Sequence, residues 1–277
     1  MLRITKSGSL RKLASKLSLL LPFSLCFAPT AIAQTSIHLE MGNPSSATSS
    51  TSNSSNYLMV KPQYALSYNN VKHEANWVSW QLNRSWLGDT PRQNDFRPDP
   101  SLPSSWYKVT SSDYTGSGYD RGHMTPSADR TDTVVNNSAT FLMTNILPQA
   151  PDNNQGYWAS LENYERSLVL NQSKELYVIA GGYGQKGTIS GNVAIPSRLY
   201  KIIVVTTPST GAAGVTSNTR VIAIDTPNSS GNRDANWGTY RTSVDALEAK
   251  TGYNFLSNVN SSVQSVIESK VDNGPTQ

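Results

Sequence analysis

The sequence has 277 residues and a formal charge of +4, with 37% hydrophobic and 15% charged residues. This modest charge and this apolar fraction predict a folded globular protein and exclude an intrinsically disordered chain. No uninterrupted apolar run reaches about 18 residues, so we expect no membrane-spanning helix and no membrane partner.

The first 33 residues have the pattern of a secretory signal peptide. They contain five basic residues and no Asp or Glu, and an apolar run extends from Leu17 to Ala28. Ala31 and Ala33 are the small residues that signal peptidases require before the cleaved bond. We therefore expect cleavage near Ala33 and export to the periplasm or the medium. The next residue is Gln34 and not the cysteine of a lipid anchor.

Cleavage of the signal peptide would lower the net charge of the protein. Eighteen basic and 19 acidic residues would remain, which gives a net charge of −1. A uniformly basic surface is excluded, so a polyanion would have to be bound by a local cluster of positive side chains. The only cysteine, Cys26, leaves with the signal. The mature chain then has no disulfide, no thiol nucleophile and no cysteine-ligated metal.

The mature chain has the pattern of one α+β domain. We expect residues 34–56 to form an N-terminal segment with an exposed loop rich in Ser and Thr, and residues 57–271 to form the domain. Apolar runs predict strands near residues 57–60, 64–68, 76–82, 174–180, 199–205 and 220–224. Since the strands do not alternate with helices, we expect a central, mainly antiparallel sheet flanked by helices.

Apolar residues at helical spacing predict helices near residues 156–170, 242–250 and 259–267. Thr242 and Asp245 approximate a capping box, and Gly252 stands where that helix should end. Residues 182–187 match the pattern GxGxxG, but a β-like sequence follows them instead of a helix. We therefore predict a turn there and no dinucleotide site.

The most informative stretch is Asp120-Arg121-Gly122-His123. His123 is a candidate general base, because the unperturbed pKa of imidazole lies nearest neutrality. Arg121 would lie on the same face as His123 if this stretch is a strand. The histidines of the mature chain fit no zinc motif, and no GxSxG nucleophile motif is present.

Further polar residues follow downstream. Asn154 stands at the start of a predicted helix, where its amide oxygen could face a hard cation. Glu162 and Arg166 are four residues apart and share a helix face. Each residue alone has an ordinary explanation, as a polar loop residue, a helix cap or a surface salt bridge. Together they suit metal-assisted attack of water on a phosphodiester.

This combination closely resembles the DNA/RNA non-specific endonucleases of the ββα-metal, or His-Me finger, superfamily. The resemblance rests on DRGH, on TNILPQ and on DNNQGYWASLENYER, at residues 120–123, 144–149 and 152–166. It extends to residues 42–44, 76–80, 92–98 and 251–256, and so covers nearly the whole mature chain. It implies that the fold contains a ββα-metal finger.

The resemblance also implies roles at the matching positions. His123 would be a neutral base that takes a proton from water, with its other ring nitrogen bonded to a backbone carbonyl. Asn154 would be the direct ligand of Mg²⁺ or Mn²⁺, and Glu162 would act on the ion through water. Asp120 would be a carboxylate behind these groups or a support of the strand. Asn145 would lie near the base and position it or the phosphate.

Three arginines, Arg92, Arg121 and Arg166, would surround the phosphate, with Arg97 as an alternative to Arg92. The implied reaction is hydrolysis of DNA and RNA to 5′-phosphorylated products without sugar or sequence specificity, because phosphate contacts carry no sequence information. The alternative is a secreted nucleic-acid-binding protein without catalysis, which the charge of −1 disfavours. A dedicated protein inhibitor is a further expected partner. Trp106 and Trp158 are expected to pack in the protein and not to stack on bases.

Overall fold

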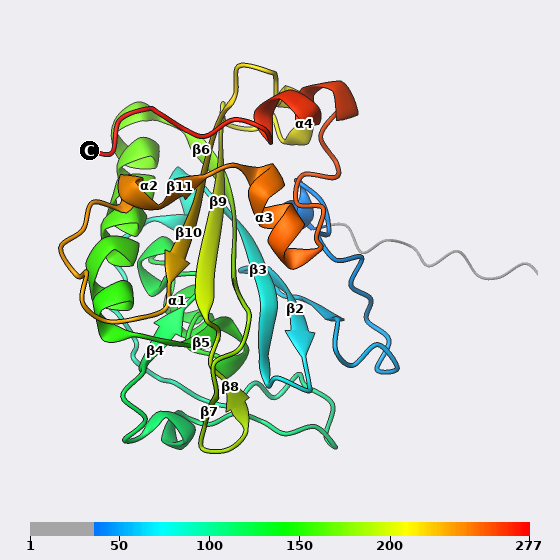
Figure 1. Cartoon of the computed structure of the whole chain (residues 1–277), viewed down its shortest axis with the longest axis vertical. Helices are drawn as coiled ribbons and strands as arrows, with labels where there is room; N and C mark the ends of the chain where they lie inside the picture. The colour runs from blue at the N-terminus through cyan, green and yellow to red at the C-terminus, as the bar shows by residue number, and fades with distance from the viewer. Residues whose placement is uncertain (1–35) are drawn as a thin grey trace, which may run out of the picture. The chain divides into compact units, whose positions relative to one another are not determined.

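The structure, a computed structural model, describes residues 36–277, so the predicted signal peptide lies outside the described residues. The described residues belong to one compact unit. Its centre is a seven-stranded sheet in which every neighbouring pair of strands is antiparallel (Figure 1). In spatial order the strands are β1 (Tyr57–Val60), β2 (Ala65–Asn69), β3 (Glu74–Leu82), β6 (Glu175–Tyr183), β9 (Arg198–Thr206), β10 (Arg220–Pro227) and β11 (Arg241–Thr242). The expected α+β fold with a central antiparallel sheet is confirmed.

The six predicted strands are all present, and their ends lie within three residues of the prediction. Apolar runs did not locate β11 or the strands of two short ribbons, because strands of two to four residues are too short for a recognisable pattern. The ribbons pair β4 (Asp120–His123) with β5 (Ile146–Gln149), and β7 (Thr188–Ile189) with β8 (Val193–Ala194). The first ribbon was expected only as part of the ββα-metal finger that the resemblance implies. Of the turn predicted at residues 182–187, the first two residues belong to the end of β6, and residues 184–187 connect β6 to β7 with no helix after them.

The sheet separates two hydrophobic cores, because alternate side chains of a strand point to opposite faces. Trp80 of β3 belongs to the first core, which α2 (Ala159–Gln172) covers. Trp77 belongs to the second core, which α3 (Val244–Thr251) and α4 (Ser261–Ile267) cover. Figure 1 shows α2 on one side of the sheet and α3 and α4 on the other. Full burial of each large apolar side chain contributes about 1.5–3 kcal/mol, so these cores can stabilise the chain without a disulfide.

The helix predicted from residue 156 begins at Ala159. Gly156 has a non-helical backbone (φ −100°, ψ −116°) that bends the turn at residues 153–158. A Cβ at Gly156 would lie 2.2 Å from the carbonyl oxygen of Arg233, so no other residue fits this close approach. The bend sets the direction in which the chain enters α2.

The remaining helices agree with the prediction to within a few residues. The cap of α3 is Ser243 and not Thr242, because the Ser243 hydroxyl accepts the hydrogen bond from the backbone of Ala246. Gly252 ends this helix in a left-handed conformation (φ 74°), as predicted. The short α1 (Val134–Ala139) was not predicted. Within residues 36–277, no helix combines the length and the apolar character needed to cross a bilayer.

The N-terminal segment packs on the sheet at both ends of its exposed loop. Residues 48–52 are exposed, as expected. The Trp77 indole donates to Ser45 (2.7 Å), and Ser45 donates to Asn56 (2.6 Å). Trp158 is buried, and Trp106 packs against the Tyr57 ring with centroids 5.0 Å apart. Both tryptophans therefore pack in the protein, as expected.

Candidate active site

The stretch Asp120–His123 forms β4, which pairs antiparallel with β5. Asp120 lies opposite Gln149, and His123 lies opposite Ile146. After β5 the chain passes through the bent turn at residues 153–158 and enters α2. Two short strands followed by a helix are the ββα module that the sequence predicts.

Gly122 lets the two strands of this module approach closely. A Cβ at this position would lie 2.1 Å from Oε1 and 2.6 Å from Cβ of Gln149. The Gln149 side chain occupies that space and donates from Nε2 to Oδ1 of Asn153 (2.6 Å). Asn153 in turn donates to the carbonyl oxygen of Pro227 (2.9 Å). The missing side chain at residue 122 therefore fixes the turn that carries Asn154.

His123 is a buried, neutral imidazole. Its ring packs against Phe96 and Phe141, with centroid distances of 5.3 Å and 4.8 Å. Burial, with a further contribution from the positive charge of Arg92, lowers its pKa to about 3. Its Nε2 has no hydrogen-bond partner among the described residues, so the expected carbonyl partner is wrong. Aromatic packing orients the ring instead.

Asn145 is completely buried, and its whole amide is bonded to the backbone. Its Oδ1 accepts from the Thr125 amide (2.9 Å), and Nδ2 donates to the carbonyl oxygens of Thr125 and Thr140 (both 2.9 Å). No group is left for a phosphate. Of the two roles expected for Asn145, contact with phosphate is therefore not present, while support of the backbone that follows His123 is.

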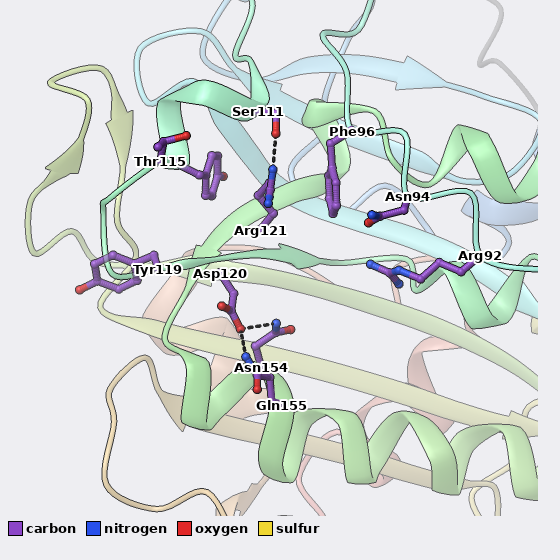
Figure 2. A pocket seen from close by; sticks show the side chains of 11 residues that line it. Arg92, Asn94, Phe96, Ser111, Thr115, Tyr119, Asp120, Arg121, Asn154 and Gln155 are labelled. Atoms are coloured by element: carbon purple, nitrogen blue, oxygen red, sulfur yellow. Dashed lines mark hydrogen bonds between the residues drawn. The ribbon is translucent and has the colours of Figure 1, made fainter.

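One pocket of about 320 Å³ gathers four of the predicted site residues. Arg92, Asp120, Arg121 and Asn154 lie around it from three separate segments of the chain (Figure 2). His123 follows two residues after Arg121 on β4 but is buried behind the pocket wall. The pocket thus combines cationic, carboxylate and amide groups beside a neutral base.

Asp120 fixes the orientation of the Asn154 amide. Its Oδ2 accepts from Nδ2 of Asn154 (2.8 Å) and from Nε2 of Gln155 (2.8 Å). Because only the NH₂ group of an amide can donate to a carboxylate, Oδ1 of Asn154 points elsewhere and has no hydrogen-bond partner within residues 36–277. Amide and carboxylate oxygens are the ligands that Mg²⁺ prefers, so this donor set fits the predicted ion.

Two residues that line the pocket, Phe96 and Ser111, hold the Arg121 side chain. Its guanidinium lies 4.7 Å above the centre of the Phe96 ring and donates to the Ser111 hydroxyl (Figure 2). A cation above an aromatic face is stabilised by about 0.5–1 kcal/mol at an exposed site. These contacts leave other N–H groups of Arg121 free for an anion.

The structure distinguishes Arg92 from Arg97. Arg92 lines the pocket, donates to the Ser127 hydroxyl (2.7 Å) and lies 4.8 Å above the Phe141 ring. Arg97 is bound to the Asp95 carboxylate (2.7 Å) and to a backbone carbonyl. Arg92 is therefore the arginine that can reach a phosphate in the pocket.

Glu162 and Arg166 lie beside the pocket and do not line it. The Glu162 side chain is 15% exposed, and burial raises its pKa while Lys201 and Arg166 oppose the rise. Arg166 donates to the Asp129 carboxylate (2.8 Å) and to Asn163 (2.7 Å). The fully buried Asp129 holds the guanidinium of Arg166 outside the pocket lining, so the contact of Arg166 with phosphate stays a prediction.

Seven residues that line the pocket were not predicted as site residues: Asn94, Phe96, Ser111, Tyr114, Thr115, Tyr119 and Gln155. Gln155 had a signal, since it is a polar residue next to Asn154 at the start of the turn. Asn94 has a left-handed backbone (φ 54°) that a sequence cannot show. Ser111 is a common surface residue type, and only the fold brings it to Arg121.

The sequence is similar to those of known nucleases. The sequence profile of the DNA/RNA non-specific endonucleases matches residues 41–262. The chain belongs to this family. The endonuclease is 57% identical over 240 residues to "Nuclease" of Nostoc sp., an alignment that covers 86% of this chain and 87% of that protein. It is 36% identical over 156 residues to human "Nuclease EXOG, mitochondrial", covering 51% of this chain and 42% of that protein.

A solved structure shares the fold of the endonuclease. It is described as the crystal structure of the EndoG/EndoGI complex, and it aligns with a TM-score of 0.68. The alignment covers 82% of this chain and 94% of that chain. At 22% sequence identity, the likeness shows the fold alone. It supports the single-domain α+β fold that the sequence predicted.

The change Gly122→Ala should destabilise the endonuclease and reduce its activity. The added methyl group would overlap Gln149, and overpacking of this kind costs about 1–3 kcal/mol. A lower urea midpoint, with reduced cleavage under conditions where the variant is folded, is the expected result. An unchanged midpoint would show that Gln149 moves aside freely and does not fix the turn.

The free energy of unfolding should fall as the pH falls from about 6.5 toward 3. The pKa of His123 is about 3 in the folded protein and 6.5 as the ordinary value, so the unfolded chain binds the proton first. The expected slope is about 1.4 kcal/mol per pH unit for each such histidine. His38, whose pKa burial lowers to about 4, acts in the same direction.

Urea unfolding at several pH values between 7.5 and 4.5 measures this slope. His123→Asn removes one titrating group, so the variant should show a shallower slope than the wild type. Identical slopes would contradict the burial of a neutral His123.

Proposed function

We propose that the endonuclease hydrolyses both DNA and RNA, without sugar or sequence specificity, in a reaction that depends on a divalent ion. The observation that carries this proposal is the pocket itself. It presents the free Oδ1 of Asn154 and the guanidinium groups of Arg92 and Arg121 beside the neutral His123. These are the groups that attack of water on a phosphodiester requires.

In this proposal His123 accepts a proton from the attacking water. Since Nε2 is enclosed, Nδ1 is the ring atom that remains to take the proton. The lowered pKa keeps the imidazole neutral at physiological pH, so it is ready to act as a base. Phe96 and Phe141 hold the ring and limit its rotation.

Arg92 and Arg121 would neutralise the charge that develops on the phosphorus-bound oxygens. Both are held in place before substrate arrives, which is the condition for electrostatic stabilisation of a transition state. Loss of one such donor costs about 2.7–4 kcal/mol in comparable sites. Asn154 would hold Mg²⁺ or Mn²⁺, with Glu162 reached through water, and the bound ion supplies Lewis-acid stabilisation of the phosphate and the leaving 3′ oxygen.

Broad substrate use follows from the kinds of groups in the pocket. The arginines and the metal-binding amide address phosphate and carry no information on base or sugar. Product ends with a 5′-phosphate are expected because the 3′ oxygen is the leaving group. The net charge of −1 after cleavage of the leader implies few phosphate contacts and therefore a measurable salt dependence.

The test is digestion of a plasmid and of total RNA in Mg²⁺ or Mn²⁺ by the mature protein. Both substrates should be degraded, and EDTA, His123→Ala or Asn154→Ala should abolish degradation. His73→Ala is a matched control, because His73 lies outside the pocket and bonds only to the carbonyl of Asn192. Binding of nucleic acid without cleavage in either ion would support the non-catalytic alternative instead.

We also propose that the endonuclease is exported and that the producing cell holds a protein inhibitor. The leader pattern at residues 1–33 supports export, and the EndoG/EndoGI complex supports an inhibitor by analogy of fold. The protein recovered from the periplasm or the medium should begin at Gln34. N-terminal sequencing of that protein checks this, and an intact Met1 would contradict cleavage.

A further inference from the structure

A fully buried lysine lies beside the site and has no part in the proposed reaction. Lys201 of β9 is 0% exposed. Its Nζ lies 3.1 Å from Oε1 of Glu165 and 3.8 Å from Oε1 of Glu162. The same atom lies 4.6 Å above the centre of the Trp158 ring and 5.7 Å above that of Trp80. The ammonium group therefore sits between two carboxylates and two indole rings.

Stability alone does not account for this arrangement. Glu165 is also 0% exposed, and neither its oxygens nor the Lys201 ammonium has a well-aligned hydrogen bond among the described residues. Removing two charges from water costs several kcal/mol per ion, and well-packed apolar residues often stabilise a core as well as a buried ion pair does. A charged pair retained here points to a role in the neighbouring site.

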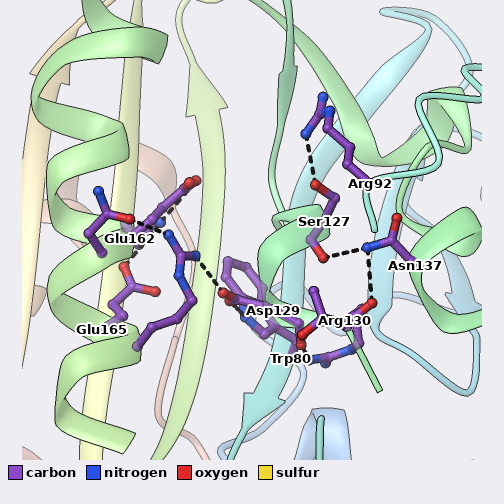
Figure 3. A network of polar contacts seen from close by, with 12 residues as sticks. Trp80, Arg92, Ser127, Asp129, Arg130, Asn137, Glu162 and Glu165 are labelled. Atoms are coloured by element: carbon purple, nitrogen blue, oxygen red, sulfur yellow. Dashed lines mark hydrogen bonds and ion pairs between the residues drawn. The ribbon is translucent and has the colours of Figure 1, made fainter. Parts of the chain in front are cut away.

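The geometry connects the pair to Glu162. Glu162 and Glu165 are three residues apart on α2, so they share the helix face that packs on the sheet (Figure 3). Glu165 is enclosed, whereas Glu162 lies at the edge with 15% of its side chain exposed. Without a cation between them, the two carboxylates would repel each other, and the exposed one would turn away.

Two other cations interact electrostatically with Glu162, but other groups hold each of them. Arg166 is bound to Asp129 and Asn163. Arg92 lines the pocket and binds Ser127, so it is available to the substrate. Within residues 36–277, the ion pair of Glu162 is the one with the buried Lys201.

We propose that Lys201 is a positioning residue, which holds the Glu162 carboxylate toward the metal-binding site while Glu165 keeps the ammonium group in place. The proposal rests on the proposed function, since it assigns Glu162 to the hydration shell of the ion. Partners behind metal ligands typically contribute 10–100-fold to metal affinity. A buried β-strand lysine that does not line the pocket would therefore determine how tightly the ion binds.

The experiment measures Mn²⁺ binding by electron paramagnetic resonance without nucleic acid, with Mg²⁺ as competitor. Lys201→Met should remain folded by circular dichroism and bind Mn²⁺ about tenfold or more weakly than the wild type. The matched control is Lys61→Met. Lys61 forms a buried ion pair with Asp99 (2.7 Å) outside the pocket, so this variant should lose stability and keep its Mn²⁺ affinity.

A second variant covers the case in which Lys201→Met does not fold. Lys201→Met combined with Glu165→Gln removes both charges at nearly constant volume and should fold. It should bind Mn²⁺ less tightly than the wild type but more tightly than Lys201→Met, because the repulsion on Glu162 is gone while its anchor is missing. Wild-type affinity in either folded variant would overturn the role of Lys201.

Different results would contradict the metal-dependent nuclease function and the positioning role of Lys201. The Asn154→Ala variant gives the level of Mn²⁺ binding that is expected when the metal-binding site is lost. If the wild type binds no more Mn²⁺ than Asn154→Ala, the proposed function itself is wrong. If only Asn154→Ala loses the ion and the Lys201 variants do not, the nuclease mechanism stands and Lys201 has no positioning role.

Discussion

The close approach of β4 and β5 at Gly122 is the constraint on which the site depends. With no side chain at this position, Gln149 crosses over β4 and bonds to Asn153. Asn153 ties the same turn to β10, so the residue that follows it is held opposite Asp120. A single missing side chain in one strand thus determines where the metal-binding amide lies relative to the base.

Charge is distributed in the endonuclease so that each cation at the pocket is held by neutral groups. Arg92 rests on a hydroxyl and a phenyl ring, and Arg121 does the same. The carboxylates are bound by other groups: Asp129 by Arg166, Glu165 by Lys201, and Asp120 by the amides of Asn154 and Gln155 in the turn before α2. The positive charge at the pocket therefore stays available to an anion, although the mature chain as a whole is close to neutral.

The sequence predicted those parts of the structure that leave a pattern in it, such as an apolar run or a motif at fixed spacing. Apolar runs located the long strands, but β4 has none and is recognisable only as a motif. The spacing of motif residues located Asn154 and Asp120. It could not show that Asn145 bonds entirely to the backbone, since a buried asparagine and one in a site look alike in sequence. Lys201 interrupts the apolar run of β9, which a pattern alone cannot distinguish from a solvent-facing lysine.

The packing of the first described residues bears on how export and folding are coupled. His38 is buried, accepts from the backbone of Gln81 and lies 2.8 Å from the carbonyl of Pro62. This docking begins within a few residues of the proposed cleavage after Ala33. A peptidase needs an extended, accessible segment around the bond it cuts. If the leader is cleaved after Ala33 as proposed, its removal would have to precede completion of the fold, and the catalytic pocket would form only after that cleavage.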